Sequence, residues 1–413
     1  MRIPTVIRIK KRRPSGWLIW LLVMMPFALA LLPHGARYLL DPVWMALLVL
    51  TVRFGGPLPK GALRWVAGLG TVLLLTSLPK SESILYLLWG FRNNFRLYAA
   101  FFAFCAFLTP EEGEGYLNKI RFLFRLNIPV TLVQYFLLGK AGDYLGGIFG
   151  TGQGCNAYTN LFFCIVVTRS LVRFLEGEEP GRECLKTCFW SLFLAALAEL
   201  KFFFLEFAVI SVLAVCFSGF SRRKLWVLLG ASVGIAAGAA LLSALFPNFR
   251  GWFSLQWLLD AAGSSRGYTS SGDLNRLNCI GRINLWFFRE PAQRLLGLGL
   301  GNCETSGFSF LNTPFYRAYG RIHYTWMSTS FWYLECGWVG LLFFFGFFVL
   351  VYLAASRLES ARCGTEKQHC RMARILAAVS CMVGIYNASL RTEAAYMIYF
   401  ALALPFLQRR RTK

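Results

Sequence analysis

The sequence predicts an all-α membrane protein: a polytopic bundle of about twelve transmembrane helices, with one long loop between the ninth and the tenth. Three observations predict this fold class. Of the 413 residues, 56% are hydrophobic and only 15% are charged, whereas a soluble protein carries roughly a quarter charged residues. Apolar runs long enough to cross a bilayer recur along the whole chain. The loops between them alternate between rich and poor in Lys and Arg, as the positive-inside rule requires.

The first third of the chain predicts four membrane helices. The N-terminal segment MRIPTVIRIKKRRP is strongly basic, so we expect it to stay in the cytoplasm. No small-residue cleavage site follows the first apolar run, which is therefore interpreted as a helix and not as a signal peptide. The apolar piece ILYLLWGF contains Tyr and Trp, and we expect it to lie separately in the membrane interface. Helices are expected at about residues 17–33, 38–53, 63–78 and 94–109.

The middle third predicts five more helices. The segment EEGEGYLNKIRFLFRLN is interpreted as a cytoplasmic amphipathic stretch, whose basic residues Lys119, Arg121 and Arg125 suit a surface of anionic lipid. Helices are expected at about residues 127–139, 157–175, 186–199, 202–218 and 225–246.

The last third contains the long loop and three helices. The loop runs over roughly 80 residues, from about Pro247 to Thr325, and is expected to be partly helical and extracytoplasmic. Helices follow at about residues 328–354, 373–388 and 392–407, and the basic tail RRRTK is expected inside. Twelve crossings place both termini on the cytoplasmic side of the plasma membrane. The predicted organisation is therefore 1–246 (nine helices), 247–327 (the loop) and 328–413 (three helices and the tail).

The basic charge argues for a membrane and not for a nucleic acid. The net charge is +23, and the positive-inside rule accounts for much of it. Nucleic-acid binding is not expected, because no polar face alternates aromatic with basic residues. The 12 cysteines include no CxxC pair, so neither a zinc site nor a redox site is expected. Cys279 and Cys303 share the long loop, where a disulfide between them is one alternative.

The long loop is the candidate site, because it combines many arginines with few acids. The planar guanidinium of arginine matches phosphate and carboxylate oxygens. The loop therefore predicts a lipid-linked phosphate or pyrophosphate, or an acidic glycan, as ligand; the alternative is a basic surface among lipid headgroups. Its arginines are Arg250, Arg266, Arg276, Arg282, Arg289, Arg294, Arg317 and Arg321, its acids are Asp260, Asp273, Glu290 and Glu304, and its one histidine is His323.

The glycine-rich segment GLGLGN, residues 297–302, is not interpreted as a dinucleotide-binding loop. It lacks the GxGxxG spacing, follows no strand and opens no helix of a βαβ unit. Its glycines are expected to make tight backbone turns. Outside the loop, Glu199 and Lys201 are expected to pair in a short turn, and Arg391 and Glu393 are expected near the outer end of the last hairpin, as structural pairs or as site residues.

The order of these motifs resembles the O-antigen polymerase and O-antigen ligase superfamily of integral membrane glycosyltransferases, of the GT-C type. The motifs are GR…LW…P…LLGLGLGN, then His323, then LECGWVGLLFF with Glu335, Gly337 and Gly340. The segment AELKFFF resembles a further feature of the family, a basic residue at the outer end of a helix. Lys201 stands where the family commonly has an arginine. In many members the histidine precedes the glutamate by about nine residues; here the interval is about one helical turn longer, and Trp326 stands in the nine-residue place.

The resemblance implies polymerisation of lipid-linked oligosaccharide repeat units into a surface polysaccharide. The donor would be a glycan on undecaprenyl pyrophosphate, the acceptor a glycan or another anchor, and the partners the lipid bilayer and polysaccharide-assembly proteins. It implies no cofactor and no metal. His323 would activate the acceptor hydroxyl, Arg282 would act in catalysis and on the pyrophosphate, and Glu335 and Arg321 would support the site. The other expected pyrophosphate ligands are Lys201, Arg289 and Arg266.

Two alternatives to a polymerase stay open. A ligase would share the chemistry and transfer the glycan to a lipid or cell-wall anchor. A transporter or flippase of lipid-linked glycans would also carry outward basic residues. However, such transporters often contain a long internal repeat or a series of membrane-buried acids, and the sequence shows neither convincingly.

Overall fold

The computed structural model describes residues 14–219, 222–246 and 273–408, and in this part of the chain it is all-helical, without a β-strand. Fifteen α-helices are described. The predicted all-α class is therefore confirmed. The calls on residues 1–13, 247–272 and 409–413, including the basic N-terminus, the tail and Arg266, lie outside the described residues.

The first four helices correct one expectation. Three short 3-10 turns join α1 (Pro14–Met24) to α2 (Leu40–Phe54), and α3 (Lys60–Ser77) precedes α4 (Ile84–Phe107). The segment ILYLLWGF is not a separate interfacial piece but the first part of α4. The helix begins early because the Ser83 side chain caps it, accepting a hydrogen bond from the Leu85 N–H at 3.2 Å.

The boundary predicted within 111–139 is also wrong. A single helix, α5 (Pro110–Phe136), contains both the amphipathic segment and the apolar run. Thr109 and Glu112 form a reciprocal capping box at its start. Pro129 lies inside the helix without ending it, which removes one backbone hydrogen bond but leaves the rest of the ladder in place.

The remaining helices that the sequence predicts as membrane helices lie close to their expected positions. They are α6 (Asn156–Glu176), α7 (Gly181–Leu197), α8 (Lys201–Phe217), α9 (Arg223–Leu245), α14 (Ser328–Glu359), α15 (Gly364–Tyr386) and α16 (Ala395–Ala403). α15 begins well before its expected start at about residue 373, so part of the predicted basic loop is helical. The described part of the long loop contains α11 (Cys279–Trp286), α12 (Pro291–Leu296) and α13 (Pro314–Tyr319).

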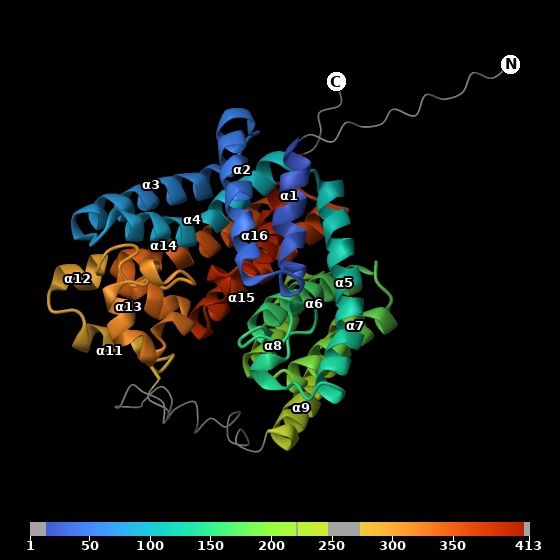
Figure 1. The fold of residues 1–413 in the computed structure, drawn as a ribbon. Coiled ribbons are helices and arrows are strands. Elements are labelled where there is room, and N and C mark those ends of the chain that lie inside the picture. The colour runs from blue at the N-terminus through green and yellow to red at the C-terminus, as the bar shows by residue number, and fades with distance from the viewer. Residues whose placement is uncertain (1–13, 220–221, 247–272, 409–413) are drawn as a thin grey trace.

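The centre of the molecule is formed by α15 and α16. All nine residues of α16 are buried, and it packs against α4, α6 and α15. On one side α3 and α4 lie with α14, and on the other side α5 to α9 form a second group (Figure 1). The helices α11 and α12 of the long loop pack against α14. The core is therefore continuous, and the loop is held at one end of the α14–α15 hairpin.

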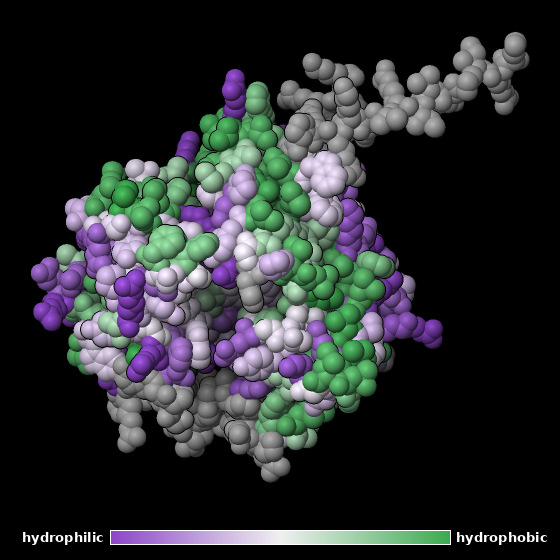
Figure 2. All heavy atoms as spheres, in the orientation of Figure 1, coloured by the Kyte–Doolittle hydropathy of each residue, from purple (hydrophilic) through white to green (hydrophobic). Residues whose placement is uncertain are grey.

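Five helices are long and apolar enough to cross a membrane: Gly35–Phe54, Lys60–Lys80, Asn156–Glu176, Arg223–Leu245 and Ser328–Glu359. Several expose large apolar side chains, such as Trp226 and Val233 on α9 and Leu75 on α3, which are 70%, 68% and 62% exposed. Figure 2 shows apolar residues spread over α2 and α3 and toward α9. Such surfaces are typical of helices that face lipid. The total of twelve crossings and the sidedness stay predictions.

Candidate functional site

A small pocket lies where the long loop meets the start of α14. It is lined by residues from the beginning of the described loop and from the segment just before α14: Asp273, Leu274, Arg276, His323, Trp326 and Met327. The Leu274 N–H donates to the Ile322 carbonyl at 2.9 Å, which joins the two segments. Thus the predicted histidine lines a pocket, together with an acid and an arginine.

His323 is held in a defined orientation. Its φ of 55° lies in the left-handed region, and its ring stacks on Trp326 with centroids 3.9 Å apart. Its Nδ1 pairs with the Asp273 carboxylate. No hydrogen-bond partner of Nε2 occurs among the described residues. Because a carboxylate at Nδ1 holds the ring proton there, Nε2 is left as a proton acceptor.

Arg276 shares this pocket and is fixed by the end of α15. Its Nε donates to the Tyr386 carbonyl at 2.9 Å, and its guanidinium lies 4.7 Å from the centre of the Tyr386 ring. The Tyr386 ring in turn stacks on the ring of Phe202, the residue after Lys201, with the ring centroids 4.1 Å apart. The sequence has eight arginines in the long loop and gives no reason to single out Arg276. Its partner, Tyr386, lies more than a hundred residues away.

Lys201 lies near Arg276. Its ammonium pairs with Glu199 at 2.9 Å, as expected. Burial lowers the pKa of Lys201, Glu199 opposes this, and the positive charge of Arg276 lowers it further. Phe202, next to Lys201, stacks on Tyr386, which binds Arg276, so the two cations lie on neighbouring segments.

Backbone strain also marks this region. Among the described residues, Glu199 and His323 are the two that have positive φ without being glycine. Such conformations cost of order 1–3 kcal/mol each and are concentrated at functional sites. Both adjoin the same group of cations, which supports a functional reading of the pocket.

The other predicted arginines are not gathered around His323. Arg282, on α11, lies over the Trp286 ring at 5.6 Å. Arg289 and Arg321 are exposed, and no side-chain contact of either is described. Arg266 lies outside the described residues. The structure thus brings His323 and Arg276 together, with Lys201 close by.

The described loop arginines nevertheless share one property. None of them forms an ion pair with any residue that the structure describes. The loop's described acids are used elsewhere: Asp273 on His323, Glu304 on Arg391, and Glu290 as the cap of α12. The arginines concerned are Arg276, Arg282, Arg289, Arg294, Arg317 and Arg321.

Glu335 organises the glycine-rich turn. It is fully buried, and its Oε1 accepts from the Cys303 N–H at 3.1 Å, while its carbonyl accepts from the Gly299 N–H at 2.8 Å. The N–H groups of residues 297–303 are all used within the protein. The turn is therefore a packing element and not a phosphate cradle, and Glu335 supports the fold beside the site.

Beneath the loop lies a network of charges in which Arg391 and Glu393 have partners that the sequence did not predict. Arg391 pairs with Glu304 at 2.7 Å, and Arg96 pairs with Glu393 at 2.9 Å. Burial would raise the pKa of Glu393, but Arg96 outweighs burial and lowers it to about 2. Tyr158 also donates to Glu393, at 3.1 Å. Arg391 and Glu393 are thus each paired with another segment, and they tie the last hairpin to α4 and to the loop.

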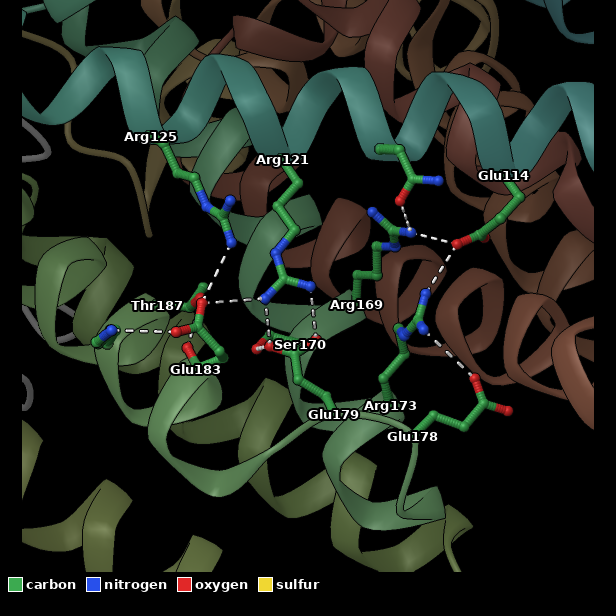
Figure 3. A network of polar contacts seen from close by, with 12 residues as sticks. Glu114, Arg121, Arg125, Arg169, Ser170, Arg173, Glu178, Glu179, Glu183 and Thr187 are labelled. Atoms are coloured by element: carbon green, nitrogen blue, oxygen red, sulfur yellow. Dashed lines mark hydrogen bonds and ion pairs between the residues drawn. The ribbon is translucent and has the colours of Figure 1, made fainter.

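A second set of arginines contrasts with those of the loop. Glu114 accepts from Arg169 and Arg173, and Arg121 makes two bonds to Glu179 at 3.0 and 3.1 Å (Figure 3). Burial would raise the pKa of Glu114, but the hydrogen bond with His369 and the neighbouring Arg169 lower it to about 2. Arg121 and Arg125, which the sequence predicts to face anionic lipid, both pair with acids. The arginines of this region are therefore structural.

The two sets lie at different ends of α15. Arg371 pairs with Glu176 and Glu359 near the start of this helix, and Tyr386 contacts Arg276 at its end. At 1.5 Å per residue, this separation is about 22 Å along the helix. The paired arginines Arg371 and Arg374 and the described loop arginine Arg276, which has no ion pair among the described residues, therefore lie toward opposite ends of α15.

The cysteines form no bridge, and Cys279 and Cys303 are buried free thiols. Cys279 contacts the Arg276 carbonyl at 3.5 Å instead. No group of three metal-binding side chains occurs in the part of the chain that the structure describes.

The chain matches no protein-family model and no curated protein.

Proposed function

We propose that this protein is a membrane glycosyltransferase that transfers a glycan from a lipid pyrophosphate to a sugar hydroxyl, as a polysaccharide polymerase does. One observation carries the proposal: a histidine oriented by a carboxylate shares a pocket with an arginine that has no acidic partner among the described residues. This combination suits a reaction with an anionic leaving group and a neutral nucleophile.

The cations act on the leaving group. When the bond between the anomeric carbon and the pyrophosphate oxygen breaks, its electron pair goes to that oxygen. Arg276, with Lys201 nearby, stabilises the charge that develops there. Arg282 and the other unpaired loop arginines attract the polyanionic donor over a longer range.

His323 acts on the acceptor. Its Nε2 accepts the proton of the sugar hydroxyl while the hydroxyl oxygen bonds to the anomeric carbon. Asp273 stabilises the imidazolium that forms, since its carboxylate pairs with Nδ1. The products are the lengthened glycan, the lipid pyrophosphate and one proton, which His323 passes to the pyrophosphate or to water.

Replacement of His323 or Arg276 by Ala in the native host tests the proposal. Expression is held constant, and the length of the surface polysaccharide is measured. We expect single repeat units and no long chains in either variant. Full-length polymer that stays on its lipid carrier would instead identify a ligase.

Arg125→Ala is the matched control. Arg125 is an exposed arginine that pairs with Glu183 at the other end of the molecule, so its loss should leave the chain length unchanged. Normal long chains in both the His323 and the Arg276 variant would refute the proposed chemistry.

A further inference from the structure

A second group of side chains, outside the pocket, has the composition of a sugar-binding surface. It consists of Tyr38, Trp89 and Phe308, here called the aromatic platform. The Tyr38 ring lies 4.9 Å from Phe308 and 6.0 Å from Trp89, centre to centre. Phe308 is 43% exposed. These rings come from a turn before α2, from α4 and from the long loop, so tertiary structure brings them together.

Two arginines contact the platform, and only one of them has an acidic partner among the described residues. Arg92 is 4.9 Å from the centre of the Trp89 ring, and Asp41 neutralises it through two hydrogen bonds of 2.8 Å. Arg37 is 5.1 Å from the centre of the Tyr38 ring and donates to the Tyr38 hydroxyl at 3.2 Å. Arg37 has no ion pair among the described residues, and its buried Nε has no hydrogen-bond partner there.

The platform differs from the exposed aliphatic surface nearby. Leu85 and Leu88 on α4 are exposed aliphatic side chains, whereas the platform combines aromatic rings with an arginine that has no ion pair among the described residues and whose Nε has no hydrogen-bond partner there. Gly307 packs closely against this arginine, since a Cβ there would lie 3.0 Å from the Arg37 Nη2, so the loop backbone borders the guanidinium. A guanidinium without an acidic partner among the described residues, beside the exposed Phe308 and the partly exposed Tyr38 and Trp89, is suited to a ligand that has both an anionic group and an apolar face.

We propose that the aromatic platform binds an anionic sugar residue, such as a uronate, of the glycan. The C–H face of the sugar ring packs on Phe308 and Tyr38, and its carboxylate accepts hydrogen bonds from Arg37. The proposal rests on the proposed function, since that function brings a glycan to this side of the molecule. It adds the substrate class, a polysaccharide with acidic repeat units, and a subsite apart from the His323 pocket.

The test measures binding in the absence of turnover. Purified full-length protein carrying His323→Ala is titrated with tri-galacturonate and with the neutral maltotriose, in a calorimeter. We expect binding of tri-galacturonate at least tenfold tighter than that of maltotriose. Arg37→Gln should weaken it at least tenfold, and Phe308→Ala should weaken both sugars. The matched control is Arg53→Ala, which removes a similar exposed contact, 5.4 Å from the Phe54 ring.

Each contrary result has a definite meaning. No binding, equal binding of the two sugars, or no effect of Arg37→Gln in a protein with unchanged melting temperature would overturn the proposal. The proposal would also be overturned if the binding of phosphatidylglycerol vesicles depended on Arg37 and the binding of tri-galacturonate did not. The site would then hold a lipid headgroup. If tri-galacturonate binds as expected but glycosyl transfer is never observed, only the proposed function fails.

Discussion

Glycine at position 301 illustrates how single residues set the geometry beside the site. Its φ is +87°, and a Cβ there would lie 2.0 Å from the Tyr86 carbonyl oxygen. Gly297 is similarly confined by the Glu335 carbonyl group, at 2.4 Å. The sequence predicts tight turns for these glycines, and the turn is present. The sequence cannot predict which residues pack against these glycines, because Tyr86 and Glu335 come from distant helices.

We expect Gly301→Ala to destabilise the protein by more than about 1 kcal/mol, because alanine strains this backbone and collides with α4. Thermal unfolding in detergent measures the effect. The control is Gly115→Ala within α5, where nothing lies within 4 Å of the added Cβ and alanine favours the helix. Equal melting temperatures of the two variants would show that the turn is not packed as described.

The partner of His323 is a second feature at the residue scale. The sequence indicates His323 as the only loop histidine, but not Asp273, which lies fifty residues earlier and carries no motif. We expect Asp273→Ala to lower kcat by about 10²-fold or more, because the imidazole loses its orientation. KM for the lipid pyrophosphate donor should change little. A variant with normal kcat, or one changed in KM alone, would contradict this role.

At the scale of elements, ion pairs connect helices that lie far apart in the sequence. Arg96 on α4 pairs with Glu393 beside α16, both almost fully buried. The sequence predicts both elements from their apolar runs, although it divides α4 and α5 incorrectly. It cannot predict the pairing, because neither hydrophobic periodicity nor loop charge indicates which acid an arginine will meet.

The Arg96–Glu393 pair predicts a pH dependence of stability. The pKa of Glu393 is about 2 in the folded protein, against an ordinary value of 4.5. Its contribution is thus present above pH 4.5 and is lost as the pH falls from 4.5 toward 2. We expect Glu393→Gln to lower the melting temperature at neutral pH and to reduce its fall in acid.

Glu183→Gln is the control for this measurement, because Glu183 is a more exposed acid whose ion pairs contribute little. An unchanged acid-dependent fall of the melting temperature in the Glu393 variant would contradict the assignment.

For the whole molecule, two groups of described arginines differ in their charge pairing. Those near the start of α15 and on α5 and α6 have acidic partners, while the described arginines of the long loop have none. Composition predicts the excess of positive charge in the loop. It does not predict that the supposed lipid-facing arginines of α5 are internally paired, since this needs the packing of three helices.

The two groups should respond differently to mutation. Arg169→Ala should destabilise the protein by about 1.5 kcal/mol or more, because it removes a charge-assisted hydrogen bond to the partly buried Glu114, which keeps Arg173 as a partner. Arg282→Ala should change stability by no more than about 0.5 kcal/mol, because it lies at the surface without an ion pair. Chemical or thermal unfolding measures both, and similar losses would remove the distinction between structural and ligand-facing arginines.

The central claim, that the Arg276 and Lys201 region binds a lipid pyrophosphate, is tested most directly by the affinity of the purified protein for farnesyl pyrophosphate. We predict that Arg276→Ala weakens binding at least tenfold, because it removes a charge-assisted hydrogen bond, whereas Arg125→Ala has no effect. Farnesyl monophosphate should bind more weakly than the pyrophosphate. Equal affinity of the wild type and the Arg276 variant, with both folded, would contradict the account.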